Sequence, residues 1–254
     1  MRPGSGALDR RHLFDPDRVP RAGVTIAVIV FPGSNDERDA AWALSALGAD
    51  PVLVWHGERE LPRGTAAVIL PGGFSYGDYL RVGAIARFAP VLRAVRDFAA
   101  DGGLVLGICN GFQILCEAGL LPGALLPNAS LSFVCGDVDL VVERDGTPFT
   151  RRSAPGDPLT IPVKHADGRF HADADLLAEL EAGERIVLRY ARGQNPNGSV
   201  ADVAGVINES GNVMGLMPHP EHAVDPLLGS GDGALILASL VDSARERSFA
   251  AAPS

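Results

Sequence analysis

Apolar residues in the first half of the chain alternate between short continuous runs and longer stretches with helical spacing. The continuous runs are rich in β-branched residues, which is typical of strands covered on both faces. The stretches between them predict helices, the first opening with a capping-box sequence at residues 34–37 and continuing through Leu47. The expected elements of this half are strands at 24–31, 51–55, 66–70 and 104–108, and helices at 34–47 and 84–100.

Beyond Leu121 the spacing becomes that of strands separated by turns, and helical spacing returns near the end of the chain. Strands alternating with helices predict a parallel sheet with helices on both faces, and the later strands would extend it as hairpins or edge strands. We expect one α/β domain at 23–247, a disordered extension at 1–22 and a frayed tail at 248–254. The elements expected in this half are strands at 133–143, 159–164, 186–190, 203–208 and 212–217, a turn at 210–212 and a helix at 233–247.

The composition is ordinary for a globular protein and argues against two classes of partner. The 254 residues are 46% hydrophobic and 21% charged, and the formal charge of −9 argues against nucleic acid, whose phosphates require a basic surface. No apolar run reaches the ~18 residues of a membrane span, and the first residues lack the apolar core of a secretory signal. Cysteines at 109, 116 and 135 suggest neither a disulfide framework nor a zinc pattern. We therefore expect a cytoplasmic protein.

A nucleophile elbow is predicted where the strand at 104–108 ends. The sequence Gly107-Ile-Cys-Asn-Gly111 places Cys109 between glycines, as a sharp strand-to-helix turn requires, because side chains at the flanking positions would collide with neighbouring backbone. At the helix N-terminus, unpaired N–H groups and the helix dipole favour the thiolate, which is the reactive form of a thiol. The alternative is that Cys109 is a small buried hydrophobic residue, as most free cysteines are.

A candidate general base lies near the other end of the chain, in Pro218-His-Pro-Glu221. In an extended chain His219 and Glu221 point to the same side, so the carboxylate can fix the tautomer of the ring and stabilise its charged form. A simple turn with a solvated carboxylate is the alternative. A metal site involving His222 is not expected, because Pro220 disfavours a helical ligand face and no second ligand cluster is visible.

A glycine-rich loop follows the strand expected at 66–70. Gly72 and Gly73 let a backbone N–H approach a reacting oxygen closely, which suits an oxyanion hole; a tight turn is the alternative. No Gly-Lys-Ser/Thr sequence follows, so the loop is not a phosphate-binding P-loop and ATP is not expected to bind this chain. Residues 75–81 contact either the substrate or a partner protein, and the sequence leaves both open.

Together these motifs resemble the class I, or triad, glutamine amidotransferases. Residues 71–81, 194–199 and 204–221 resemble more closely one branch of that family, the glutaminase subunits that serve an ATP-dependent synthetase in purine biosynthesis. The resemblance runs from about residue 24 to about residue 242. The positions that carry the class I pattern are Gly107, Cys109, Gly111 and Gln113, followed by His219 and Glu221.

The resemblance implies a fold and a reaction. The fold is a flavodoxin-like three-layer α/β sandwich, with a mostly parallel central sheet and added antiparallel strands. The reaction is hydrolysis of L-glutamine through a cysteine thioester, with Cys109 as nucleophile, His219 as base and Glu221 as its partner. Ammonia would pass to a large synthetase subunit, which binds ATP and magnesium, with the assistance of a small third subunit. No cofactor or metal is expected on this chain.

The resemblance also assigns binding roles around the nucleophile. The backbone N–H groups of Gly73 and Asn110 would form the oxyanion hole. Gly72 and Gln113 would help to bind substrate glutamine, the alternative for Gln113 being a partly exposed helix residue.

Two segments depart from the family pattern, and two other functional classes stay open. Cys135-Gly-Asp137 stands where a basic and an aromatic residue are expected, and Lys164-His-Ala-Asp-Gly168 replaces Ala-His-Gly-Glu-Gly. Both lie outside the triad and bear on glutamine binding or partner docking. A protease-like or chaperone-like hydrolase on the same elbow would be favoured if the chain cleaved peptides and ignored glutamine. A binding module without catalysis is disfavoured by the intact triad.

Overall fold

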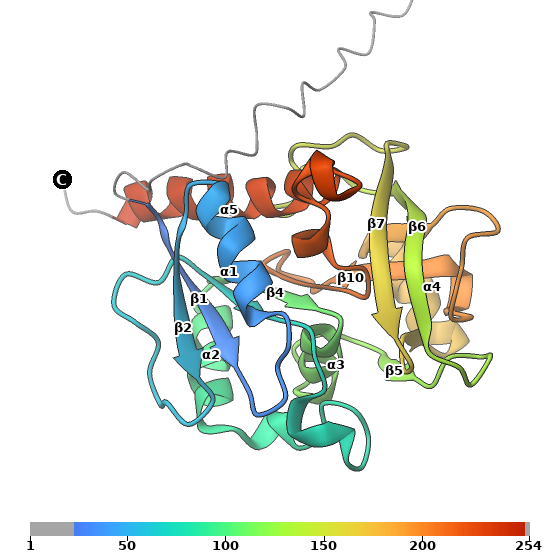
Figure 1. The fold of residues 1–254 in the computed structure, drawn as a ribbon, viewed down its shortest axis with the longest axis horizontal. Helices are drawn as coiled ribbons and strands as arrows, with labels where there is room; N and C mark the ends of the chain where they lie inside the picture. Colours follow the sequence, from blue (N-terminus) through green and yellow to red (C-terminus); the bar gives the residue numbers. More distant parts are fainter. Residues whose placement is uncertain (1–22, 252–254) are drawn as a thin grey trace, which may run out of the picture.

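Four segments rich in β-branched residues form parallel strands in the computed structural model, which describes residues 23–251. Strands β1 and β3 lie side by side, with β2 outside β1 and β4 next to β3. Nearly every side chain of β1, β3 and β4 is buried, because helices cover both faces of this part of the sheet (Figure 1). The strands are β1 Thr25–Val30, β2 Asp50–Trp55, β3 Ala67–Leu70 and β4 Leu104–Ile108.

Five further strands extend this sheet beyond β4. Strand β11 runs parallel to β4, and each following neighbour is antiparallel to the one before it. The order across the sheet is β2-β1-β3-β4-β11-β10-β9-β6-β7, and β5 and β8 form a separate pair. The predicted parallel sheet with added antiparallel strands is thus confirmed. The bounds are β5 Ala124–Leu126, β6 Val134–Val142, β7 Pro158–His165, β8 Arg169–His171, β9 Ile186–Tyr190, β10 Val203–Ile207 and β11 Val213–Leu216.

Right-handed crossovers place the helices on both faces of the sheet. The chain moves outward from β1 to β2 through α1 and in the opposite direction from β3 to β4 through α2, so these helices cover opposite faces. The direction in which the chain moves across the sheet reverses between β1 and β3. Doubly wound sheets bind ligands beyond the carboxyl ends of the strands at such a reversal. The helices are α1 Glu37–Ala46, α2 Pro90–Ala100, α3 Asn110–Glu117, α4 Ala174–Ala182 and α5 Gly233–Ala251, with 3-10 turns η2 Ser75–Asp78, η3 Ala86–Phe88, η4 Val200–Asp202, η5 Pro220–His222 and η6 Pro226–Leu228.

Two predicted helices differ from those in the structure. The capping box is wrong: Ser34 Oγ accepts the Phe31 N–H, and α1 begins after Asp36, whose side chain makes no capping hydrogen bond. The helix predicted at 84–100 is interrupted, because Pro90 disfavours a helical conformation at the preceding Ala89, which is extended between η3 and α2.

The ends of the chain and some short elements also differ from expectation. Helix α5 continues past Arg247 to Ala251. The pattern does not predict the short elements α4, β5 and β8. The extension expected at 1–22 and residues 252–254 of the expected tail lie outside the described residues. Within the described part, no helix is long and apolar enough to cross a membrane.

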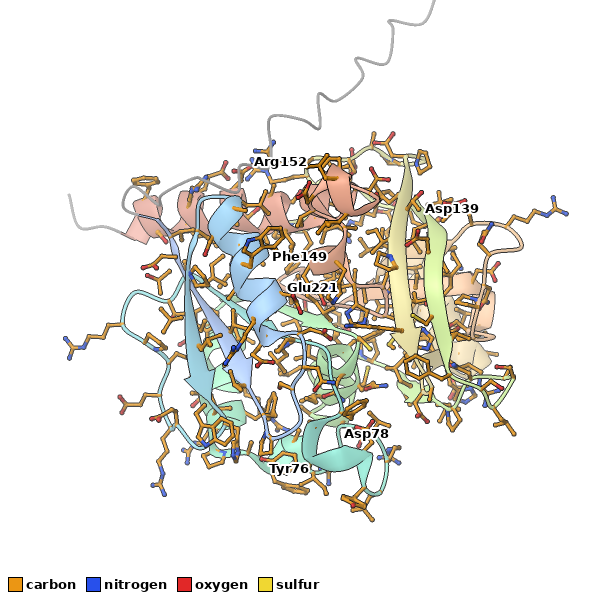
Figure 2. All side chains as sticks on the ribbon, in the orientation of Figure 1. Tyr76, Asp78, Asp139, Phe149, Arg152 and Glu221 are labelled. Carbon is orange, nitrogen blue, oxygen red and sulfur yellow. The ribbon has the colours of Figure 1, made fainter. Side chains whose placement is uncertain are left out.

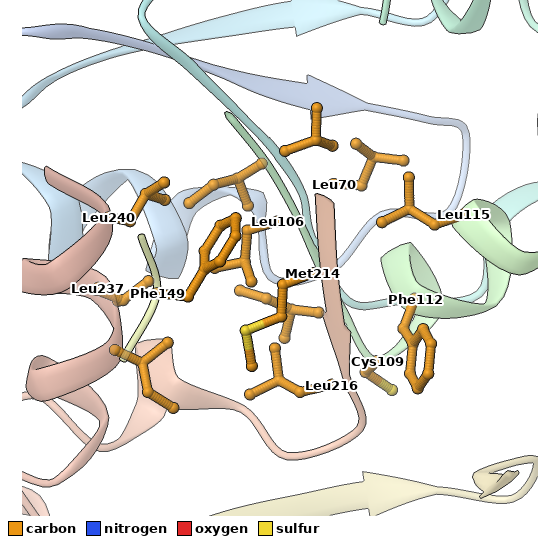
Figure 3. Close-up of a cluster of buried hydrophobic side chains, with 14 of the residues drawn as sticks. Leu70, Leu106, Cys109, Phe112, Leu115, Phe149, Met214, Leu216, Leu237 and Leu240 are labelled. Atoms are coloured by element: carbon orange, nitrogen blue, oxygen red, sulfur yellow. The ribbon is translucent and has the colours of Figure 1, made fainter. Parts of the chain in front are cut away.

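A cluster of buried apolar side chains supports the carboxyl end of β4 (Figure 3). Phe112, Leu115, Met214 and Leu216 are fully buried, and Cys109 lies beside Phe112. Burial of each large apolar side chain contributes about 1.5–3 kcal/mol. The turn that carries Cys109 is therefore anchored in the core.

Candidate active site

Cys109 occupies a strained turn between β4 and α3. Its dihedral angles are φ 50° and ψ −103°, outside the regions that L-residues favour, and its N–H donates to Leu216 O at 2.8 Å. A Cβ on Gly111 would overlap Leu70 O, and one on Gly107 would lie 2.7 Å from the Gly111 carbonyl carbon. Neither glycine of the predicted elbow therefore leaves room for a side chain.

His219 and Glu221 meet in the loop after β11. Glu221 Oε1 lies 2.6 Å from His219 Nδ1, and both side chains are buried. Pro220 begins the turn η5, so one 3-10 turn makes this pair rather than the extended chain expected from the sequence. Among the described residues His219 Nε2 has no hydrogen-bond partner, which leaves this nitrogen free for a reacting group.

The charge of His219 is set by two opposing effects. Burial alone would lower the pKa of this ring, because it disfavours the imidazolium. The negative charges of Glu221 and Cys109, with the hydrogen bond that Glu221 accepts from the ring, outweigh burial and raise the pKa of His219 to about 10. The ring therefore holds a proton at neutral pH and can deliver it from Nε2 to a leaving group.

Two backbone N–H groups meet a requirement of an oxyanion hole. Neither Gly73 nor Asn110 donates its backbone N–H to another described residue. Gly73 has φ 142°, and a Cβ there would lie 2.6 Å from Gly33 O, so this position requires glycine. Asn110 begins α3, where first-turn N–H groups have no partner inside the helix.

A chain of hydrogen bonds ties the elbow to two neighbouring loops. Asn110 Oδ1 accepts the Ser75 N–H at 3.2 Å, and Asn110 Nδ2 donates to Gln113 Oε1 at 2.9 Å. Gln113 Nε2 in turn donates to Asp167 O at 2.5 Å. Gln113 is 5% exposed, so the alternative of a partly exposed helix residue is wrong. These bonds fix the orientation of both amides beside Cys109.

A cavity of about 250 Å³ gathers most of the predicted site residues. Glu221 is buried and bonded to His219, and Figure 2 shows Asp78 and Tyr76 at the 3-10 turn η2. The lining residues are Asn35, Asp36, Gly73, Phe74, Asp78, Cys109, Gln113, Phe133, Lys164, His165, Ala166, Asp167 and His219.

Gly72, predicted to bind substrate, lies against His219 and Asp36. A Cβ at this position would lie 2.6 Å from His219 Cε1 and would overlap the Asp36 carboxylate. The Gly72 carbonyl accepts the Asn35 N–H at 3.1 Å. The absence of a side chain thus lets His219 and Asp36 pack against the loop after β3.

Sequence reasoning missed Asp36, which joins the site from the start of α1. Its Oδ2 lies 3.6 Å from His219 Nδ1, and Lys164 Nζ lies 2.5 Å from its Oδ1. Asp36, His219, Glu221 and His222 place four titratable side chains within 4.8 Å of one another, and Lys164 Nζ bonds two of them, Asp36 and His222. No sequence signal identifies Asp36, because the missing cap bond to α1 is visible only in the structure.

Comparison with known proteins gives concordant matches over most of the chain. A family model described as a CobB/CobQ-like glutamine amidotransferase domain matches residues 23–231. The chain is 59% identical over 220 residues to phosphoribosylformylglycinamidine synthase subunit PurQ of Rubrobacter xylanophilus, covering 87% of this chain and 99% of that protein. The protein of the same name from Frankia casuarinae is 58% identical over 217 residues, with coverage of 85% and 92%.

A solved structure agrees with these matches. A chain in the structure of PurLQS from Thermotoga maritima has a TM-score of 0.79 and 45% sequence identity, covering 87% of this chain and 98% of that one. The predicted fold class is confirmed by this similarity.

Proposed function

The chain belongs to the family of phosphoribosylformylglycinamidine synthase PurQ subunits, and from this membership we propose that it hydrolyses L-glutamine to glutamate and ammonia. The observation that carries the proposal is the buried His219–Glu221 pair, whose free Nε2 lies at the cavity that contains Cys109. A nucleophilic thiol, a base and a group that orients the base are the parts that covalent acyl transfer requires.

The reaction divides between two half-reactions. Cys109 Sγ attacks the side-chain amide carbon, while the N–H groups of Gly73 and Asn110 stabilise the oxyanion by about 3 kcal/mol each, by analogy with serine hydrolases. His219 gives its Nε2 proton to the departing nitrogen, so that ammonia leaves and a γ-glutamyl thioester forms. The neutral ring then takes a proton from water, which attacks the thioester to release glutamate and free the sulfur.

Ammonia is the product that the partner needs. Released into water it would be protonated and lost as a nucleophile, so we assign its use to a synthetase subunit that converts formylglycinamide ribonucleotide to formylglycinamidine ribonucleotide with ATP and magnesium. A small third subunit completes the assembly, and the name PurLQS of the solved relative supports a complex of this kind. The chain lacks a P-loop sequence, so we assign ATP to the synthetase subunit. We assign this chain no cofactor or metal, and we place the complex in the cytoplasm.

Residues 75–81 divide between two roles in this proposal. Asp78 lines the cavity and is assigned to the substrate side. Tyr79 and Leu80 are 75% and 87% exposed, and exposed apolar side chains in one place mark protein contacts. We assign these two side chains to docking of the synthetase subunit.

The test of the proposed function is release of glutamate from glutamine by the full chain, alone and with the synthetase and small subunits. An uncoupled glutaminase would waste glutamine, so we expect slow hydrolysis by the isolated chain and acceleration in the complex. Hydrolysis of peptides with no effect on glutamine would overturn the assignment in favour of a protease-like enzyme.

The Gly72→Ala variant tests whether the loop after β3 positions His219. The added methyl group would press against His219 Cε1 and the Asp36 carboxylate, and a displacement of about 1 Å can cost on the order of 10²-fold in rate. We expect kcat for glutamine hydrolysis in the complex to fall by roughly that factor. The matched control is Gly57→Ala, where the new Cβ would make ordinary contact with Trp55 at 3.4 Å. Equal kcat values for the two variants would contradict this role.

A further inference from the structure

A second carboxylate lies beside the histidine of the proposed triad. Asp36 Oδ2 is 3.6 Å from His219 Nδ1, the same nitrogen that Glu221 bonds at 2.6 Å. The Asp36 side chain is 3% exposed, and a buried carboxylate is costly unless it is paired and hydrogen-bonded. Its position therefore calls for a reason beyond packing.

Asp36 does not cap the helix that it precedes. It stands at the N-cap of α1, where Asp ordinarily accepts a backbone N–H of the first turn, yet its side chain makes no such bond. Asp173 at the start of α4 behaves in the ordinary way and accepts the Leu176 N–H at 2.9 Å. The Asp36 carboxylate is instead committed to the cavity beside His219.

Two cationic or polar partners hold Asp36 in place. Lys164 Nζ of β7 lies 2.5 Å from Asp36 Oδ1, and His222 Nε2 of η5 lies 3.1 Å from the same oxygen. Burial opposes ionisation of Asp36, but the hydrogen bonds from His222 and Lys164 and the charge of His219 hold its pKa well below the usual range. Asp36 is therefore an anion at neutral pH.

The charged groups around His219 come from four places in the fold. Glu221 and Cys109 contribute negative charge from the loop after β11 and from the elbow, and Asp36 adds a third anion from the start of α1. Lys164 Nζ and His222 Nε2 both bond Asp36 Oδ1, and His222 Nε2 also lies 3.7 Å from Glu221 Oε1. His165 follows Lys164, and burial together with the charge of His219 lowers its pKa to about 4, so it is neutral. The Lys164 ammonium is the ion-pair partner of Asp36 in this group.

We propose that Asp36 and Lys164 are positioning residues that together set how tightly His219 holds its proton. Asp36 favours the imidazolium that must protonate departing ammonia. Lys164 offsets part of that negative charge, so that the ring can still release the proton and act as a base on water. The inference rests on the proposed function of the same site, which requires His219 to be an acid and a base in turn.

The experiment changes each charge separately. Asp36→Asn removes the anion, Lys164→Met removes the cation, and Lys164→Arg retains the cation on a different side chain. Asp39→Asn is the matched control, since it removes an acidic group from the first turn of the same helix. The titration midpoint of His219 is followed by ¹⁵N NMR of the histidine-labelled full chain, with His219→Ala to assign the signal. The alkaline limb of kcat/KM for glutamine is measured in the assembled complex.

Opposite shifts are the expected result. A neighbouring charge moves a pKa by about one unit or more, so we expect the midpoint to fall by about one pH unit in Asp36→Asn and to rise by about one in Lys164→Met. Lys164→Arg and Asp39→Asn should keep the wild-type midpoint, and the alkaline limb of kcat/KM should move with the midpoint. A purely structural role would not move the two variants in opposite directions.

The outcomes separate this inference from the proposed function. Midpoints that stay at the wild-type value, or that move in the same direction, overturn the inference even if the complex hydrolyses glutamine normally. Opposite shifts in a complex that ignores glutamine support the inference about charge and reject the proposed function. If Asp36→Asn does not fold, the difference in His219 midpoint between Lys164→Met and Lys164→Arg decides. Both variants are expected to fold, because the Lys164 side chain is 35% exposed.

Discussion

Replacement of Cys109 by serine is expected to abolish glutamine-dependent amidine formation in the assembled complex while leaving the ammonia-dependent reaction close to the wild-type rate. The physical reason is that the thiol supplies only ammonia, whereas the ATP-dependent chemistry is assigned to another polypeptide. Loss of a catalytic nucleophile can cost about 10⁶-fold in kcat, which places the remaining glutamine reaction below ordinary detection. The measurement is formation of formylglycinamidine ribonucleotide with glutamine and, in parallel, with ammonium salts.

The other two cysteines provide matched controls for that experiment. Burial raises the pKa of the Cys116 thiol, and its Sγ lies 3.5 Å from Pro122 O, away from the elbow. Cys135 is exposed at the start of β6. We expect Cys116→Ser and Cys135→Ser to keep glutamine-dependent activity. Full glutamine-dependent activity of Cys109→Ser, or loss of its ammonia reaction in a correctly assembled complex, would refute the division of labour.

The fold was predictable where local pattern and burial agree. The first four strands and the elbow follow from continuous apolar runs and from the two glycines around Cys109, and the amidotransferase resemblance is confirmed by the PurQ relatives. The errors have local and tertiary causes. Pro90 interrupts the helix expected at 84–100, and Ser34 Oγ accepts the nearby Phe31 N–H instead of capping α1. The Asp36 carboxylate, in contrast, is drawn from the cap by a distant residue, Lys164.

The candidate site was predictable only in part, for a related reason. Cys109, His219 and Glu221 each sit in a short motif whose chemistry can be recognised locally. Asp36 and Lys164 are 128 positions apart, and neither lies in such a motif. Their contact depends on the start of α1 and strand β7 placing both side chains at the same cavity, which only the assembled sheet reveals. The sequence also does not reveal that a side chain at Gly72 would crowd His219 and Asp36.

The histidine and its carboxylate should respond very differently to replacement. We expect His219→Ala to lower kcat for glutamine hydrolysis by on the order of 10⁴-fold or more, because the proton donor to ammonia and the base for water are both lost. The loss of kcat in Glu221→Gln should be about a hundredfold smaller, since the new side-chain amide can still bond the His219 ring although the negative charge is gone. The measurement is steady-state glutamate release by each variant in the complex, with KM determined separately.

The second carboxylate beside His219, that of Asp36, limits the loss expected in Glu221→Gln. With a second carboxylate 3.6 Å from His219 Nδ1, the ring of Glu221→Gln retains a nearby anion. Removing both charges should therefore cost more than the two single losses combined, because each carboxylate partly compensates for the other. The double variant Asp36→Asn/Glu221→Gln should approach the activity of His219→Ala, whereas Glu221→Gln paired with Asp39→Asn should match Glu221→Gln alone. Wild-type rates for His219→Ala or for Glu221→Gln would rule out the triad, and strictly additive losses in the double variant would leave Asp36 without a share in the charge of His219.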